Sequence, residues 1–299
     1  MLYFLPEKVK GVLSVFLFSI NTLFWVGLLL TVSLFRIIIP LKFWYVLTSK
    51  ISIFIANSWI TGNNLLIALF QKIEWDVEFS GDLKMNDWYL VLSNHQTWID
   101  IIVLQKVLLH KIPFLKFFLK KELIWVPVLG LAWWSLEFPF MKRYSKEFLE
   151  RNPHLKGKDI ESTRKACEKY KTMPISIMNF MEGTRFTESK KEKQKSPYKN
   201  LLKPKAGGIS LVMNSMGEML HKIADITIYY PEGPKTFWEF LCGKTTRIVV
   251  KVDIIPITDE IRGDYVNDPE FTKKFQSWLN NYWAKKDLLL TKIKNSGNI

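Results

Sequence analysis

Two side chains suited to acid–base chemistry lie five positions apart in the first third of the chain. His95 follows the β-prone segment WYLVLS, and Asp100 immediately precedes an apolar run, IIVLQKVLL, that suits a helix. On one regular helix the two side chains would point ~140° apart, which is poor geometry for contact. If His95 lies in the turn before the helix, the carboxylate can reach back to the imidazole and leave its other nitrogen as a general base. A structural histidine at a strand–helix corner is the alternative.

A second polar cluster follows another strand pattern, Ile175–Phe180, and includes Glu182, Gly183, Thr184 and Arg185. A small residue, a hydroxyl and a guanidinium make a compact cradle for an anion; an ordinary charged turn is the alternative. Two strand-to-helix corners of one sheet can face each other, which would place the base beside this cradle. With no protein nucleophile in evidence, the pairing suits activation of a substrate hydroxyl.

Other familiar sites are not expected. The two cysteines, Cys167 and Cys242, exclude a disulfide-dense scaffold and a four-thiolate zinc site, and we interpret both as reduced, buried thiols. With four histidines and no H-E-x-x-H pattern, no metal site is predicted. Gly243-Lys244-Thr245 ends like a phosphate-binding loop, but Trp238 stands where that motif needs a glycine.

Composition narrows the class of protein. The chain has 299 residues and a formal charge of +14, with 48% hydrophobic residues and 12 tryptophans. That much apolar material excludes a disordered chain, and the basic balance suits nucleic acid or an anionic membrane surface. The lysine-rich segment Glu188–Lys205 lacks regularly placed aromatics that would stack on bases, so no nucleic-acid partner is expected. We expect this segment to be a polar loop too charged to pack, in a position where it could also face a phosphate.

Long uncharged segments near the N-terminus favour the membrane. Residues 11–35 carry no charge, and a helix of that length can cross a ~30 Å hydrocarbon core. No small-residue cleavage site follows, so we expect the segment to be retained rather than removed as a signal peptide. A second uncharged stretch, 51–71, has a polar middle that is costly beside lipid. Residues 1–74 are therefore expected to be a membrane anchor of one or two transmembrane or re-entrant helices. Two spans or a re-entrant hairpin would leave both ends in the cytoplasm, and we favour that arrangement.

The rest of the chain alternates strand and helix patterns. Strands are predicted where Val, Ile and aromatic residues cluster, at Val77–Phe79, Trp88–Ser93, Ile175–Phe180, Asp225–Tyr230 and Arg247–Ile257. With helices predicted at 160–171 and Lys205–Met219, residues 75–265 are expected to form an α/β domain, a mixed central sheet flanked by helices. Asp268-Pro269-Glu270 is a strong helix start, and residues 266–299 are predicted to be an amphipathic helix packed on that domain. An interfacial membrane helix is the alternative.

The two polar clusters also carry a family resemblance. Asn94-His95-x4-Asp100 and Glu182-Gly183-Thr184-Arg185, at this separation, resemble the glycerolipid acyltransferases of the PlsC, or lysophosphatidic acid acyltransferase, type. Lys120-Lys121-Glu122-Leu123 and the segment Phe138–Arg143 resemble further blocks of that family, and the finer detail is similar to its YihG-like inner-membrane branch. The likeness extends over nearly the whole chain. It departs at Met181, where many members have proline, and at Asp225–Pro231, which replaces a Val/Pro-rich block.

The resemblance implies a membrane-bound enzyme that moves a fatty acyl group from acyl-CoA or acyl-carrier protein to the free hydroxyl of a lysophospholipid, with no further cofactor. The expected acceptor is 1-acyl-glycerol-3-phosphate, which would give phosphatidic acid. The implied roles are general base for His95, its orienting partner for Asp100, and acceptor binding for the block Glu182, Gly183, Thr184 and Arg185. Lys120 and Arg143 match further acceptor- or phosphate-contacting positions. The implied location is the bacterial inner membrane, with the catalytic domain facing the cytoplasm.

Alternatives stay open at this point. The acceptor could be another lysophospholipid, such as lysophosphatidylglycerol or lysocardiolipin, or the chain could be a non-catalytic membrane adaptor of the same fold. Trp125, Trp133 and Trp134 lie in the apolar stretch Leu123–Phe140, which could line an acyl tunnel, rest on the membrane or belong to the core. Neither the donor nor the oligomeric state follows from the sequence.

Overall fold

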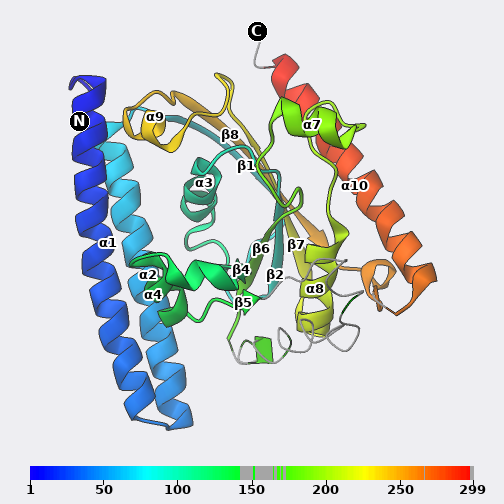
Figure 1. The fold of residues 1–299 in the computed structure, drawn as a ribbon, viewed down its shortest axis with the longest axis horizontal. Coiled ribbons are helices and arrows are strands. Elements are labelled where there is room, and N and C mark those ends of the chain that lie inside the picture. The colour runs from blue at the N-terminus through cyan, green and yellow to red at the C-terminus, as the bar shows by residue number, and fades with distance from the viewer. Residues whose placement is uncertain are drawn as a thin grey trace.

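A mixed sheet of six strands lies at the centre of the molecule (Figure 1). The computed structural model describes residues 1–141, 151, 164, 167, 168, 170, 173–265 and 267–296. Neighbouring strands follow the order β1-β8-β7-β2-β6-β3. β7, β2, β6 and β3 run parallel to one another, whereas β8 is antiparallel to β7 and parallel to β1. The predicted α/β class with a mixed sheet is confirmed. The strands are Glu74–Ser80 (β1), Tyr89–Ser93 (β2), Leu115–Phe117 (β3), Ser176–Phe180 (β6), Lys222–Tyr229 (β7) and Arg247–Pro256 (β8).

Helices lie on both sides of this sheet. α3 and α4 separate it from the long pair α1 and α2, and α7, α8 and α10 lie on the opposite side (Figure 1). A short second sheet pairs β4 (Leu119–Lys120) with β5 (Phe140–Met141). Within the described residues, the α-helices are Glu7–Ile38 (α1), Lys42–Phe70 (α2), Ile99–Leu108 (α3), Leu129–Ser135 (α4), Glu188–Gln194 (α7), Ala206–Met216 (α8), Phe237–Leu241 (α9) and Pro269–Ser296 (α10). The 3-10 turns in the same part of the chain are Lys121–Trp125, Gly217–Met219 and Asp259–Ile261.

Alternation along β2 explains how the sheet holds two hydrophobic cores. Tyr89 and Val91 point into the core shared with α3, whereas Leu90 and Leu92 point into the core shared with α8 and α10. All four side chains are fully buried. A strand covered on both faces needs apolar residues at every position, which is why β2 forms a continuous apolar run.

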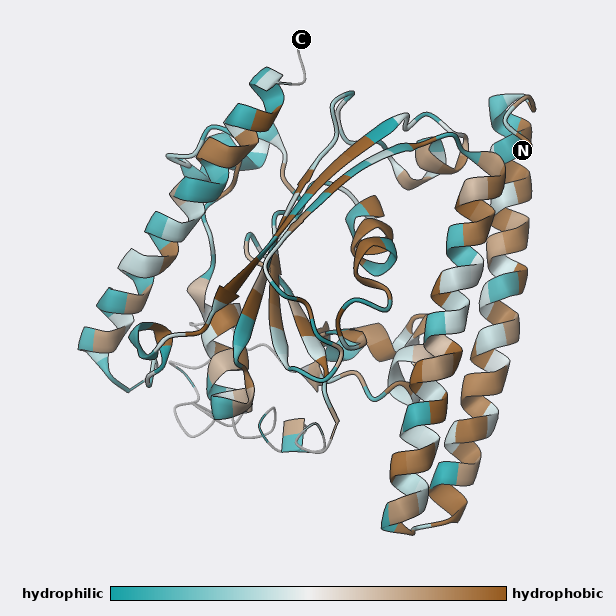
Figure 2. Cartoon of the chain, turned by 180° about the vertical axis from the view of Figure 1, so that it is seen from behind, coloured by the Kyte–Doolittle hydropathy of each residue, from teal (hydrophilic) through white to brown (hydrophobic). Residues whose placement is uncertain are grey.

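α1 and α2 form an antiparallel hairpin whose polar residues meet between the two helices. Asn21 donates to the carbonyl of Trp59 at 3.2 Å and to Asn63 Oδ1 at 2.9 Å, and its own Oδ1 accepts from the Trp25 indole at 2.9 Å. Polar side chains that would be costly beside lipid are thereby hydrogen-bonded. The hydropathy colouring shows apolar residues along much of both helices (Figure 2). Both helices are long and apolar enough to cross a membrane.

The lysine-rich segment differs from the expected polar loop. Thr187 caps α7 by accepting from the Lys190 N–H, so the first half of the segment is helical. Further on, Tyr198, Leu201 and Leu202 are buried in the core. The prediction that this segment is too charged to pack was wrong because its apolar residues face inward while its lysines remain at the surface.

α10 holds that packed segment in place. Its buried residues Phe275, Leu279 and Trp283 belong to the core on the α8 side of the sheet. Asp287 accepts from the backbone N–H groups of Lys199 and Asn200, and the Trp283 indole donates to the carbonyl of Leu202 at 2.8 Å. Most of the helix predicted at 160–171 lies outside the described residues.

Candidate active site

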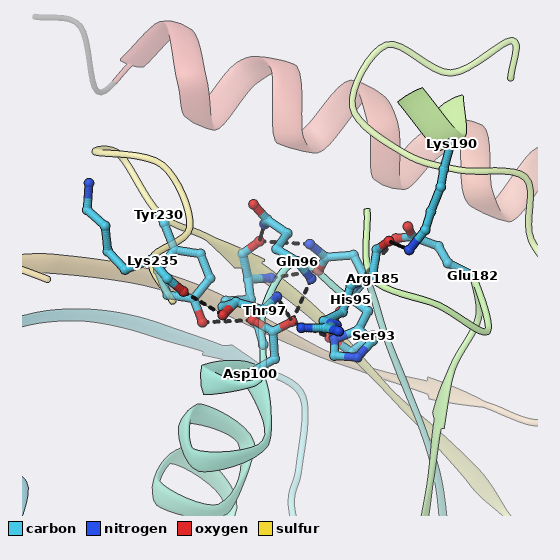
Figure 3. A network of polar contacts seen from close by, with 12 residues as sticks. Ser93, His95, Gln96, Thr97, Asp100, Glu182, Arg185, Lys190, Tyr230 and Lys235 are labelled. Atoms are coloured by element: carbon cyan, nitrogen blue, oxygen red, sulfur yellow. Dashed lines mark hydrogen bonds and ion pairs between the residues drawn. The ribbon is translucent and has the colours of Figure 1, made fainter. Parts of the chain in front are cut away.

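The topology of the sheet gathers polar side chains at one edge. β2, β6 and β7 are parallel neighbours, so their carboxyl ends lie together. His95, Glu182 and Tyr230 follow these three ends by one or two residues each, and Figure 3 shows them converging. Carboxyl ends of parallel strands are the usual binding edge of an open α/β sheet. The candidate active site is therefore built on three loops that a rigid sheet positions.

The structure brings His95 and Asp100 into contact across a bend. His95 lies in the turn after β2, Asp100 lies in the first turn of α3, and His95 Nδ1 is 2.8 Å from Asp100 Oδ2. The imidazole also stacks on Phe180, with ring centroids 3.8 Å apart and planes 13° apart. In the tautomer in which Nδ1 donates to this carboxylate, the other ring nitrogen, Nε2, carries no proton and can act as a base.

Asp100 is itself held by three further donors. Its Oδ2 accepts from the backbone N–H groups of Gln96 at 2.6 Å and Thr97 at 3.0 Å, and its Oδ1 accepts from the Tyr230 hydroxyl at 2.7 Å. The side chain is fully buried. A carboxylate that only accepts is well matched to this set of donors. Sequence analysis missed Tyr230, and the signal that could have found it was its place at the end of a parallel strand.

Asn94 joins the loop of His95 to the neighbouring strand. Its side-chain amide donates to the carbonyl of Ile228 and accepts from the N–H of the same residue, both at 2.9 Å. A buried amide with both ends satisfied fixes the loop in one conformation. In the motif Asn94-His95, Asn94 therefore fixes the loop, and His95 is the candidate base.

Glu182 accepts a hydrogen bond from the main chain of His95 and does not line the cavity. Its side chain is buried, and its Oε1 accepts from the backbone N–H of His95 at 3.2 Å. Oε2 has no hydrogen bond within the part of the chain that the structure describes. Burial raises the pKa of Glu182 to about 8, and the His95 N–H acts in the opposite direction. Glu182 is thus placed to hold the main chain at His95, and its predicted role in acceptor binding stays a prediction.

The residues after Glu182 form a tight turn that presents a cation. Gly183 has φ +66°, a conformation that favours glycine, and its N–H donates to the Phe180 carbonyl at 2.9 Å. The guanidinium carbon of Arg185 lies 4.9 Å from the centre of the Trp98 ring, within cation–π range. Thr184 Oγ1 accepts from Lys190 Nζ at 2.8 Å, so its hydroxyl is partly engaged.

One cavity of about 490 Å³ joins the base to the anion cradle. It is lined by aromatic and apolar residues of β3, β6 and α8, by His95, Gly183, Thr184 and Arg185, and by Lys205, which sequence analysis did not single out as a site residue. A hydroxyl bound in this cavity can meet a base at one wall while an attached anion meets cations at another.

Other predicted site residues are not brought to this cavity. Lys120 is exposed on β4 and does not line it, and Arg143 lies outside the described residues. Trp125 and Trp134 are 85% and 43% exposed and do not line it either. The wall opposite His95 is built instead from residues such as Phe117 and Leu211.

A family model and several known proteins are similar to this chain in sequence. Residues 76–231 match the model of the family described as Acyltransferase. The chain is 23% identical over 239 residues to mouse 1-acyl-sn-glycerol-3-phosphate acyltransferase epsilon, a match that covers 72% of this chain and 61% of the mouse protein. It is 24% identical over 324 residues to the 2-acyl-1-lysophosphatidylinositol acyltransferase of Saccharomyces cerevisiae, covering 91% and 76%.

A human relative and a solved structure are also similar to this chain. Human 1-acyl-sn-glycerol-3-phosphate acyltransferase delta is 27% identical over 188 residues, covering 60% of this chain and 45% of the human protein. The chain thus spans less than two thirds of the mouse and human relatives. The crystal structure of the 1-acyl-sn-glycerophosphate (LPA) acyltransferase PlsC from Thermotoga maritima superposes with a TM-score of 0.55 at 15% identity, covering 95% of this chain and 98% of that one. The two proteins share a fold.

Proposed function

Because the chain belongs to the PlsC-type glycerolipid acyltransferase family, we propose that it moves a fatty acyl group from acyl-CoA or acyl-carrier protein to the free hydroxyl of a lysophospholipid. The observation that carries this proposal is the 2.8 Å contact between His95 Nδ1 and Asp100 Oδ2, with the imidazole lining the same cavity as Arg185. A base beside a cation is what a reaction on the hydroxyl of a phosphorylated acceptor requires.

In the proposed reaction His95 Nε2 takes the proton of the acceptor hydroxyl as that oxygen attacks the thioester carbonyl carbon. The new C–O bond forms, the C–S bond breaks, and the imidazolium returns the proton to the departing thiolate. Asp100 orients the ring and stabilises the positive charge that develops on it. Tyr230 and the backbone donors hold Asp100, and Glu182 holds the main chain at His95.

We propose 1-acyl-glycerol-3-phosphate as the acceptor and phosphatidic acid as the product. Arg185 would pair with the phosphate, and Gly183 allows the turn that presents it. The names of the mouse and human relatives support this acceptor, whereas the yeast relative is named for lysophosphatidylinositol. Lys120 and Arg143 stay predictions as further phosphate contacts.

We further propose that the hairpin lies within one leaflet and does not cross the bilayer. At one end of α1, Ser14 donates to the carbonyl of Leu241 in α9. At the other end, Arg36 pairs with Glu137 Oε2 at 3.2 Å and donates to the carbonyl of Ser135. Since the domain flanks α1 at both ends, a hairpin that crossed the membrane would carry this ion pair and parts of the domain into lipid, at a high cost.

An in-plane hairpin would face lipid with its outer side. The exposed apolar residues of α1 run along its length, and they include Val12, Phe16, Leu23, Phe24, Leu34 and Ile37. Such a surface suits an amphipathic element at the membrane interface. Because acyl-CoA and acyl-carrier protein are cytoplasmic donors, we place the domain on the cytoplasmic side, and the YihG-like resemblance favours the inner membrane of a bacterium.

The decisive experiment compares wild type with His95→Ala in acyl transfer from acyl-CoA to lysophosphatidate. We expect turnover to be lost in the variant while its association with lipid vesicles is unchanged. His221→Ala is the matched control, because His221 is exposed and precedes β7 at the opposite edge of the sheet. Full activity of His95→Ala would remove the proposed base. Absence of turnover by wild type with every lysophospholipid would favour the non-catalytic adaptor.

A further inference from the structure

The lysine-rich segment contributes one side chain to the cavity. Two of its lysines have partners close by: Lys190 Nζ donates to Thr184 Oγ1 and to the carbonyl of Arg185, and Lys191 pairs with Glu188. Of the seven lysines at positions 190, 191, 193, 195, 199, 203 and 205, Lys205 alone lines the cavity that holds His95.

The backbone of Lys205 is held by a hydrogen bond, whereas its ammonium group has no partner among the described residues. Its backbone N–H donates to the carbonyl of Met181 at 2.7 Å, which ties it to the turn that carries Arg185. Its stem crosses Gly183 so closely that a Cβ there would lie 3.0 Å from Lys205 Cδ and 3.4 Å from Nζ. The ammonium has no hydrogen bond or ion pair with the described residues. A cation held at a cavity wall without an internal partner is available to a ligand.

The charges around the cavity favour an anion with more than one negative charge. The charged or titratable side chains that line it are His95, Arg185 and Lys205, and none of the described lining residues is an aspartate or glutamate. The nearby carboxyl groups of Glu182 and Asp100 are buried, and each forms a hydrogen bond with His95 instead of lining the cavity. Two cations therefore face the ligand without a compensating carboxylate in the wall.

We propose that Lys205 is the specificity-determining residue that selects a phosphomonoester acceptor over a phosphodiester. The inference rests on the proposed function. Arg185 can engage two phosphate oxygens with its planar fork. A diester has only two terminal oxygens and one negative charge, so Arg185 alone can satisfy it. A monoester has a third terminal oxygen and a charge of roughly −1.5 to −2 at neutral pH, and Lys205 stands where that oxygen and that charge can be met.

The test measures kcat and KM of wild type, Lys205→Met and Lys203→Met with two acceptors of identical acyl chain, lysophosphatidate and lysophosphatidylglycerol. Losing one charge-assisted hydrogen bond should raise the KM of Lys205→Met for lysophosphatidate about tenfold, with kcat nearly unchanged. The KM for lysophosphatidylglycerol should change less than about twofold, since the diester does not need this contact. Lys203 is exposed and does not line the cavity, so Lys203→Met should match wild type with both acceptors. Lys205→Arg should restore part of the preference.

The pH dependence supplies an independent readout. The phosphomonoester loses its second charge below a pKa of about 6, so the preference of wild type for lysophosphatidate should shrink below that pH. The ratio of the two acceptors cancels every pH effect that both reactions share. The preference of Lys205→Met should be small and independent of pH.

Several outcomes would overturn the proposal. Equal losses with both acceptors in Lys205→Met would make Lys205 a structural residue, and unchanged kinetics would remove it from the site. Binding of the two lysolipids without a thioester donor, in detergent micelles, separates this inference from the proposed reaction. If wild type binds lysophosphatidate in preference and Lys205→Met does not, yet neither turns over, the selectivity stands and the reaction fails. Equal binding of both lysolipids by wild type overturns the selectivity.

Discussion

The carboxylate of Asp100 is held from several directions, and one of its donors comes from a distant part of the chain. Tyr230 is fully enclosed near the end of β7 and donates to Oδ1 at 2.7 Å. Burial and the neighbouring Asp100 carboxylate both raise the pKa of this phenol well above its usual range, so it remains a donor at working pH. In this geometry the orientation of His95 depends on a chain of contacts from Tyr230 through Asp100.

Replacing Tyr230 by phenylalanine should therefore weaken catalysis without removing the base. The variant leaves Asp100 Oδ1 buried without its donor, which costs about 1–3 kcal/mol, and we expect kcat to fall about tenfold with KM little changed. Tyr229→Phe is the control, because its hydroxyl has no hydrogen bond in the described structure. Steady-state kinetics with lysophosphatidate would check this, and equal kcat values for the two variants would contradict it.

Glu182 makes the stability of the protein depend on pH. Its pKa is raised by burial from 4.5 to about 8, so the folded state keeps a proton that the unfolded chain releases. Between these values the unfolded state binds fewer protons, and the free energy of unfolding of wild type should fall as pH rises from about 5 to about 8. Glu182→Gln has no proton to lose and keeps a similar shape. Its free energy of unfolding should fall less steeply over this range.

The difference in free energy of unfolding between Glu182→Gln and wild type should therefore change with pH in favour of the variant. Between acidic pH and pH 7 this change should be on the order of 2 kcal/mol. Denaturant unfolding of the detergent-solubilised protein at several pH values would measure it. Parallel pH profiles for the two proteins would show that Glu182 is already ionised in the folded state.

At the scale of elements, the hairpin depends on a close approach at one glycine. A Cβ at Gly62 would lie 2.5 Å from Asn21 Oδ1, in the middle of the hydrogen bonds that join α1 to α2. Gly27, also helical, has nothing within 4 Å of such an atom. The two glycines thus provide a matched pair in similar backbone but different surroundings.

Gly62→Ala should lower the melting temperature of the detergent-solubilised protein, because Asn21 must move and lose hydrogen bonds worth about 1–3 kcal/mol. Gly27→Ala should leave it unchanged or raise it slightly, since alanine favours a helix over glycine by about 1 kcal/mol. Thermal unfolding followed by circular dichroism would test both. A similar change in the two variants would mean that the contact at Gly62 does not hold the helices together.

α10 is the element that shapes the far wall of the site. By binding the backbone at Lys199 and Asn200 and the carbonyl of Leu202, it sets the course of the chain that leads into Lys205. Its Lys286 is buried and pairs with Asp225 of β7, which fastens the helix to the sheet near the same edge. The C-terminal helix thus contributes to the cavity without contacting the ligand.

For the whole molecule, the position of the hairpin on the domain predicts from which side of the membrane the connection between α1 and α2 is accessible. Leu41, 60% exposed, lies in the connection between α1 and α2. In a hairpin that lies within one leaflet, Leu41→Cys should react with a membrane-impermeant maleimide added on the side of the domain. In a hairpin that crosses the bilayer, it should react only from the opposite side.

Reconstituted vesicles with the domain outside would make this measurement. The native thiols, Cys167 and Cys242, are buried, so the background should be low. Lys203→Cys, exposed on the domain, reports the fraction of outward-facing protein. Labelling of Leu41→Cys to the same extent as Lys203→Cys would support the in-plane hairpin, and labelling only after the vesicles are opened would exclude it.

The sequence by itself determined the local structure and the chemical identity of the site. Runs of Val, Ile and aromatic residues predicted five of the sheet strands, the uncharged stretches predicted the long helices, and His95 with Asp100 predicted a contact across a bend. These features depend on neighbours within a few positions, where side-chain periodicity and short-range geometry decide the outcome. The strands β3, β4 and β5 were missed because a strand of two or three residues is too short to show a periodic pattern.

Only the tertiary structure decided which distant residues complete the site. Tyr230 reaches Asp100 across 130 positions of sequence, and one lysine of seven turns toward the cavity. Both results follow from strand order and from the way α10 holds the segment before Lys205, and neither is encoded in a local pattern. Packing also overruled the charge of that segment, because burying Tyr198, Leu201 and Leu202 stabilises it while the lysines stay in water.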